Sequence, residues 1–141
     1  MEPVYRWVDH TAEVELALEG ACEREVFAAA LAALAELLGF PPEKGRHEPE
    51  EQRTVTVAQG QPDGDRAALL VGWLEELVFL AESQGFVATR LLDLELTPAG
   101  LGARVGGLID APPPLVKAVT LHRLMFEPRG EGYVARVVLD V

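Results

Sequence analysis

The segment DHTAEVE near the start of the chain carries three carboxylates, on Asp9, Glu13 and Glu15. A fourth, on Asp140, stands beside the last residue, Val141. Carboxylate oxygens are hard ligands, so a site built from them suits Ca²⁺, Mg²⁺ or Mn²⁺ better than zinc. If the last strand pairs beside DHTAEVE, these charges and the terminal carboxylate converge, and a bound cation would relieve their repulsion. Outward-facing glutamates on a half-buried strand are more often simply solvated, so the residues alone leave both interpretations open.

His10 follows Asp9 directly, and the pair resembles half of an acid/base arrangement. No Gly-x-Ser-x-Gly motif accompanies it, and a structural role is favoured for the only cysteine, Cys22. The sequence therefore disfavours a covalent hydrolase. Two roles remain for His10: orienting the turn through a side-chain hydrogen bond, or assisting a metal-dependent hydrolase in which Glu13 and Asp140 hold the ion.

Lys117 lies among apolar residues in VKAVTLH, where it either extends its ammonium group into solvent or offers a positive charge to a partner. The formal net charge of -11 disfavours strong nucleic-acid binding, because such binding relies on Lys and Arg at the phosphates. The glycines of GARVGG are accompanied by no Walker lysine, so a nucleotide-binding loop is not expected. An acidic protein of this kind suits a divalent cation, a basic protein partner, or solubility alone.

Alternating and helical patterns of apolar residues predict the elements that would position these side chains. Strands are expected over 4–8, 14–18, 52–60, 92–96, 101–110, 115–128 and 133–141, and helices over 23–39 and 66–85. Asp65 is expected to cap the second helix and Gly85 to end it, with Trp73 and Phe79 in the core. This order predicts an α+β fold, a two-layer sandwich in which a mostly antiparallel sheet carries both amphipathic helices on one face.

At 141 residues the chain is long enough for one well-packed domain, and we expect a single domain over residues 1–141. One cysteine allows neither an internal disulfide nor a cysteine-rich zinc site. The sequence has no uncharged apolar run long enough to cross a bilayer and no basic start followed by an apolar segment. We therefore expect a cytoplasmic protein that does not associate with membranes.

Four separated segments resemble the archease family. YRWVDHTAEVE is similar to the family's opening D-H-T-A-D motif, and WLEELVFL, VKAVTLH and VVLDV are similar to its W-L-x-E-L, V-K-A-x-T-x-H and V-x-F-D-V patterns. Their order and spacing match from end to end, so the resemblance covers essentially the whole chain. It implies an accessory protein, not itself an enzyme, that promotes guanylylation and multiple turnover of an RtcB-type tRNA-splicing RNA ligase.

The resemblance also implies a divalent-ion site, with calcium as the ion, made by Glu13, Asp140 and the carbonyl oxygen of Val141. The family's important lysine in the V-K-A motif falls on Lys117. Family members usually have Asp where this chain has Glu13, and the longer glutamate would either bind the ion through both oxygens or change the position of the ion. Asp9 is a further candidate ligand, directly or through water.

With this resemblance included, we interpret DHTAE and LDV as two halves of one cation site that strand pairing joins. The favoured function is a metal-binding partner of an RNA ligase. Two alternatives remain: a stand-alone metal-assisted hydrolase, and a chaperone-like module that binds proteins through exposed strand faces.

Overall fold

The computed structural model describes residues 3–10, 13–40, 51–58 and 65–141, except for the side chains of Asp9 and His10. These ranges contain β1 (Val4–His10), β2 (Glu13–Gly20), α1 (Glu23–Leu37), β3 (Glu51–Ala58), α2 (Arg66–Gln84), β4 (Phe86–Thr97), β5 (Gly100–Ile109), β6 (Ala118–Arg129) and β7 (Gly132–Asp140). The polar segment EKGRHEPEEQ (43–52), which has no apolar period and so predicts a loop, and the turn-forming QPDGD (61–65) fall mostly outside the described residues. No helix within the described ranges is long and apolar enough to span a membrane.

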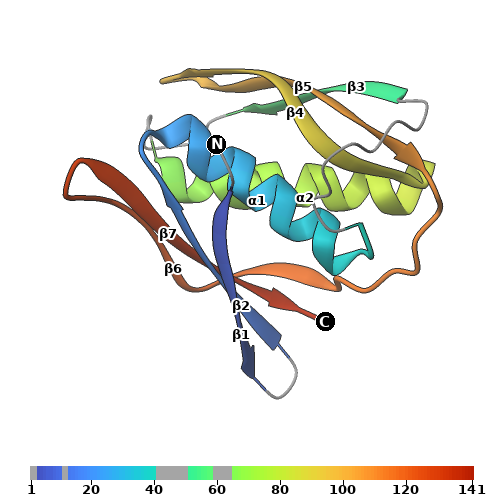
Figure 1. Cartoon of the computed structure of the whole chain (residues 1–141), viewed down its shortest axis with the longest axis horizontal. Coiled ribbons are helices and arrows are strands. Elements are labelled where there is room, and N and C mark those ends of the chain that lie inside the picture. Colours follow the sequence, from blue (N-terminus) through green and yellow to red (C-terminus); the bar gives the residue numbers. More distant parts are fainter. Residues whose placement is uncertain (1–2, 11–12, 41–50, 59–64) are drawn as a thin grey trace.

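The strands form two antiparallel sheets with both helices between them (Figure 1). Sheet A has the strand order β1-β2-β7-β6, and sheet B has the order β3-β5-β4. The α+β class and the antiparallel pairing are confirmed. In place of the expected single sheet with helices on one face, two sheets cover the helices from opposite sides. Periodicity shows which residues alternate along a strand, but not which strands pair, so it does not reveal this division.

Helix α1 is covered by both sheets. Its buried residues run almost without a break from Val26 to Ala35, and Ala29, Ala30 and Ala33 are fully buried. A helix that is apolar on all sides has to be enclosed on all sides. Accordingly, α1 packs against β2 and β7 of sheet A and against β4 of sheet B. The continuous apolar run in the sequence is the one local sign of this enclosure.

Helix α2 begins and ends where the sequence predicts. The Oδ1 atom of Asp65 accepts a hydrogen bond from the N–H of Ala68 at 3.1 Å, and Gly85 ends the helix in the left-handed conformation with φ 67°. Trp73 is fully buried, as expected. Phe79 is 59% exposed, so its expected place in the core is wrong. Six residues correspond to about one and two-thirds helical turns, and Phe79 therefore points away from Trp73.

Tyr5 joins β1 to the last turn of α1, because its hydroxyl donates a hydrogen bond to the carboxylate of Glu36. Burial, this hydrogen bond and the negative charge of Glu36 raise the pKa of Tyr5 to about 12 from its ordinary value of 10.0. The fold thus favours the neutral phenol. The stabilisation that comes from neutral Tyr5 is complete below the ordinary pKa of 10.0 and is lost as the pH rises through about 12.

We expect an ultraviolet absorbance titration to show Tyr5 ionising near pH 12, with circular dichroism confirming that the protein stays folded. The step should disappear in Tyr5→Phe. In Glu36→Gln the pKa of Tyr5 should fall, since the amide removes the negative charge that opposes phenolate formation. Ionisation of Tyr5 at its ordinary pKa in the folded wild-type protein would contradict this account.

Candidate metal centre

One end of sheet A gathers the candidate residues, which lie on β1, β2 and β7 and just before β6. In the register, His10 of β1 lies opposite Glu13 of β2, and Glu13 lies opposite Asp140 of β7. Asp140 in turn lies opposite Ala118, the first residue of β6. The pairing of the last strand with the DHTAEVE segment, on which the prediction of a shared site depends, is therefore confirmed.

The alternation of β2 and β7 sets the direction of the two carboxylates. Leu16 of β2 and Leu139 of β7 are fully buried in the core between the sheets. Glu13 and Asp140 occupy the alternate positions and point to the outer face of sheet A. Directly opposed residues of an antiparallel pair have Cβ atoms about 5 Å apart on the same face. The two carboxylates consequently repel each other unless a cation or solvent lies between them.

Glu15 shares this outer face but is already paired. Its side chain is only 11% exposed, and Arg123 Nη2 lies 2.8 Å from its Oε1. Arg123 comes from an irregular part of β6, where the register with β7 shifts between Thr120 and Met125, and it has φ 55°. The guanidinium of Arg123 compensates the charge of Glu15, which leaves Glu13 as the candidate ligand on β2. Sequence reasoning missed this pair, because periodicity gives no sign of the irregularity that positions Arg123.

Lys117 stands immediately before β6 and next to Asp140. Its main-chain N–H donates a hydrogen bond to the carbonyl oxygen of Asp140 at 2.8 Å. The side chain of Lys117 is exposed, so a protein that approaches this end of sheet A can reach the ammonium group. The structure therefore brings Lys117 to the same end of the sheet as Glu13 and Asp140.

The remaining candidates are Val141, Asp9 and His10. Val141 follows Asp140 directly and is exposed at this end of the sheet. The register puts His10 opposite Glu13, whereas Asp9 lies opposite Val14. Since the side chains of Asp9 and His10 lie outside the described residues, their roles as a ligand and as an orienting group stay predictions.

The described side chains would offer two carboxylates, those of Glu13 and Asp140, to a cation at this site. In the part of the chain that the structure describes, no group of three or more His, Cys, Asp and Glu side chains is placed to hold a metal. Further ligands would have to come from the main-chain oxygen of Val141, from water, or from Asp9, whose side chain lies outside the described residues. Carboxylate, main-chain carbonyl and water oxygens are the usual ligands of Ca²⁺, and Mg²⁺ retains more of its water. This donor set fits Ca²⁺, Mg²⁺ or Mn²⁺.

Comparison with known proteins gives matches along almost the full length of the chain. The model of the Archease protein family (MTH1598/TM1083) matches residues 5–141. The protein archease of Pyrobaculum neutrophilum is 29% identical over 147 residues, which cover 97% of this chain and 95% of that relative. The protein archease of Archaeoglobus fulgidus is 32% identical over 143 residues, which cover 97% of this chain and 98% of that relative.

A solved structure supports the fold independently. The solution structure of protein 1598 of Methanobacterium thermoautotrophicum superposes on this chain with a TM-score of 0.67. The superposition covers 97% of this chain and 98% of that chain, at 24% sequence identity. The two proteins share a fold although three-quarters of their residues differ.

Proposed function

Because the chain belongs to the archease family, as its four sequence motifs predict, we propose that it is an accessory protein of an RtcB-type tRNA-splicing RNA ligase. In this role it promotes guanylylation of the ligase and allows each ligase molecule to join more than one RNA. In this proposal the protein has no catalytic activity of its own and works in the cytoplasm together with the ligase.

The observation that carries the proposal is the register that brings Glu13 and Asp140 together at one end of sheet A. These two residues belong to the first and last of the four motifs, so segments from the two ends of the sequence meet in one place. Lys117 of the third motif lies beside them. Three motifs that are remote in sequence therefore contribute to a single surface, as a shared function requires.

Each residue of this surface has a distinct part in the proposal. A divalent cation is held by Glu13, Asp140 and the main-chain oxygen of Val141. Glu15 takes no part, because its carboxylate forms an ion pair with Arg123. When bound, the cation supplies positive charge to an otherwise negative end of sheet A. Lys117 offers a second positive group, which an acidic group of the partner can contact.

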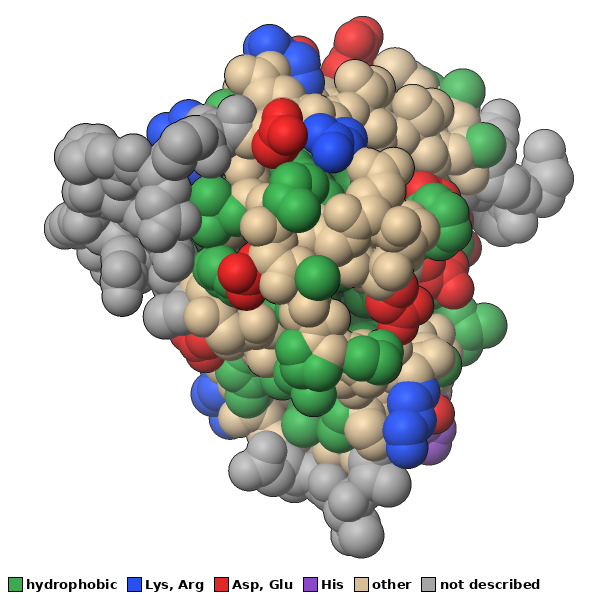
Figure 2. Space-filling view, turned by 90° about the vertical axis from the view of Figure 1, so that its right-hand side faces the viewer, with side chains coloured by type: hydrophobic (Ala, Val, Ile, Leu, Met, Phe, Trp, Pro, Cys, Tyr) green, Lys and Arg blue, Asp and Glu red, His purple; other side chains and the backbone are tan. Residues whose placement is uncertain are grey.

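The charge of the molecule supports a partner with a basic surface. The formal net charge is -11, and Asp and Glu side chains are spread over the face in Figure 2 rather than gathered in a single patch. Opposite charges on two proteins raise their association rate, although salt screens the attraction beyond about 8 Å under physiological conditions. The same negative charge opposes direct binding to RNA. An acidic protein can thus meet an RNA-binding enzyme without competing for its substrate.

Ligase turnover tests the proposal directly. With substoichiometric RtcB-type ligase, excess broken RNA, GTP and Mn²⁺, we expect product to exceed one equivalent of ligase only when this protein is added. Asp140→Asn should weaken both cation binding and the stimulation by about tenfold or more, because an amide oxygen is a poorer ligand than a carboxylate. Glu82→Gln removes one exposed carboxylate from α2 outside the four motifs and is the matched control, with full stimulation expected.

The outcomes of this experiment separate the candidate functions. Full stimulation by Asp140→Asn would remove the cation from the proposed mechanism. Absence of any wild-type effect on both turnover and guanylylation would contradict the accessory role. Hydrolysis of phosphoesters with Mn²⁺ and no ligase would favour the stand-alone hydrolase, and suppression of aggregation that persists in EDTA would favour the chaperone-like module.

A further inference from the structure

Strand β6 departs from regular pairing beside the candidate metal centre. Its register with β7 shifts between Thr120 and Met125, where residues 121–124 stand against a single residue of β7. Within this segment Arg123 has φ 55°, a left-handed conformation that residues with a side chain rarely adopt. Such a conformation persists only where the surrounding structure maintains it, and these positions are concentrated at functional sites.

The surrounding contacts fix both the backbone and the side chain of Arg123. Its carbonyl oxygen accepts a hydrogen bond from Arg136 Nε at 3.2 Å. The N–H of the preceding residue, His122, donates to Thr120 Oγ1 at 3.2 Å. With the backbone held in this way, the guanidinium Nη2 of Arg123 lies 2.8 Å from Glu15 Oε1.

The carboxylate of Glu15 lies close to the two proposed ligands. Glu13 and Glu15 are two residues apart on β2, so they share the outer face of sheet A with Cα atoms about 7 Å apart. Glu15 lies opposite Val138, which makes Asp140 its diagonal neighbour at about 7–8 Å. The side chain of Glu15 is only 11% exposed. Water therefore screens its charge poorly from an ion between Glu13 and Asp140.

The charge around a cation site sets its affinity. Calcium sites are tuned by the number of charged ligands, and a positive group several ångströms away opposes the ion. Arg123 acts in both ways, because it neutralises a third carboxylate and brings a guanidinium to the same face. Without Arg123, a cation would experience the charge of three carboxylates on this face instead of two.

We propose that Arg123 limits the affinity of the metal centre for its cation, by neutralising Glu15 and by holding the Glu15 carboxylate away from the ion. The proposal rests on the metal centre of the proposed function, and it makes Arg123 a positioning residue and not a ligand. A site limited in this way exchanges its ion with the solution more readily than a site with three uncompensated carboxylates.

Isothermal titration calorimetry with Ca²⁺, on the full chain after removal of metal with EDTA, measures the relevant Kd. Arg123→Gly removes the guanidinium and suits the left-handed backbone, and we expect the Kd to fall about tenfold. Glu15→Gln leaves the guanidinium without its carboxylate, so the Kd should rise about threefold. The double variant loses one charge of each sign, and its Kd should return to within about twofold of the wild-type value.

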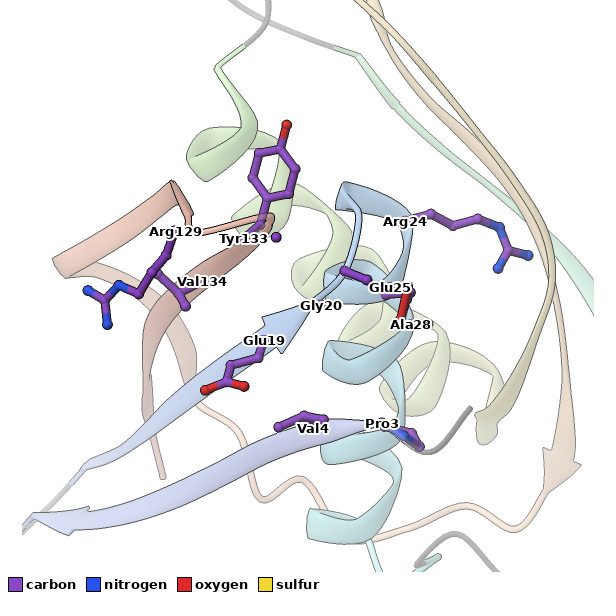
Figure 3. A pocket seen from close by; sticks show the side chains of 12 residues that line it. Pro3, Val4, Glu19, Gly20, Arg24, Glu25, Ala28, Arg129, Tyr133 and Val134 are labelled. Carbon is purple, nitrogen blue, oxygen red and sulfur yellow. The ribbon is translucent and has the colours of Figure 1, made fainter.

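The matched control is another arginine–glutamate pair of β6. Arg129 Nη2 lies 3.6 Å from Glu127 Oε1, and both side chains are exposed. Arg129 lines a pocket of about 560 Å³ at the opposite end of sheet A, between the start of β1, the end of β2, α1 and the β6–β7 turn (Figure 3). Arg129→Gly and Glu127→Gln make the same changes of charge far from the metal centre. Because salt screens such remote charges, both variants should keep the wild-type Kd.

Opposite shifts in Kd for the two single variants separate this role from a purely structural ion pair, which would lower the Tm of both variants and leave the Kd unchanged. An unchanged Kd in Arg123→Gly, or an equal fall in Arg129→Gly, would overturn the proposal. If Arg123→Gly does not fold, Glu15→Gln still decides, since an unchanged or lower Kd contradicts the proposal. Absence of Ca²⁺ binding in both the wild type and Arg123→Gly would overturn the metal centre itself, and this role with it.

Discussion

Combining Glu13→Gln with Asp140→Asn is expected to abolish the stabilisation of this protein by Ca²⁺. A ligand that binds only the folded state raises the free energy of unfolding by about 2.7 kcal/mol when its concentration is a hundred times its Kd. For a domain of this size, that corresponds to an increase in Tm of about 10 °C. The wild-type protein should show this increase in differential scanning calorimetry, and the double variant should show none, because it has lost both carboxylates that the described side chains would offer to the ion.

In EDTA the difference in Tm between the wild type and the double variant should vanish or reverse. The two carboxylates lie on directly opposed residues, and without a cation they repel each other. The double variant is then expected to have a Tm equal to or slightly above that of the wild type. Glu76→Gln combined with Glu82→Gln removes two exposed carboxylates from α2 and should keep the full Ca²⁺ response. A double variant of the site that keeps the wild-type response would place the cation elsewhere on the molecule.

Trp73→Ala is expected to have the largest effect on stability, lowering the free energy of unfolding by about 3–5 kcal/mol. The side chain of Trp73 is fully buried, and its Nε1 donates a hydrogen bond to the carbonyl oxygen of Phe27 at 3.0 Å. The two rings pack edge to face, with centroids 6.4 Å apart. The indole thus holds α2 to α1 between the sheets. A loss of this size is a large share of the roughly 5–15 kcal/mol that stabilises a typical domain.

Two further variants calibrate this loss. Trp73→Phe keeps an aromatic ring but removes the donor, so we expect a smaller loss of about 1–2 kcal/mol. Phe79→Ala truncates an aromatic side chain on the same helix that is 59% exposed, and its effect should stay within about 0.5 kcal/mol. Urea unfolding followed by circular dichroism measures all three. Equal urea midpoints for Trp73→Ala and Phe79→Ala would show that Trp73 does not stabilise the packing of α2 against α1.

The order and type of the elements could be predicted because they depend on local signals. Asp65 and Gly85 mark the ends of α2 through capping and a left-handed residue, and alternation marks the strands. The division into two sheets could not be predicted, since it depends on contacts between residues far apart in sequence. Phe79 shows the same limit on a smaller scale. An apolar residue on a helix indicates burial only when its direction relative to the core is known.

The candidate site was predictable only in part for a similar reason. Family motifs pointed to Glu13, Asp140 and Lys117, and the register of sheet A brings them to one end of the sheet. The ion pair of Glu15 with Arg123 depends on an irregularity in β6, which no alternating pattern announces. The pocket at the other end depends on how β1, β2, α1 and the β6–β7 turn meet. Such features follow from tertiary structure and have no signature of their own in the sequence.

The topology of the two sheets also sets the order in which they can form during synthesis. The strands of sheet B and helix α2 lie within residues 51–109. This half can therefore assemble before residues 110–141, which carry β6 and β7, have been synthesised. In sheet A, β2 has to wait for β7, and at roughly 5–20 residues per second that wait lasts on the order of ten seconds. Meanwhile β2 is paired with β1 along one edge, and its other edge, which pairs with β7 in the finished fold, is open. Newly made chains are therefore most prone to aggregate in this interval, and the pairing of Glu13 with Asp140 is among the last events of folding.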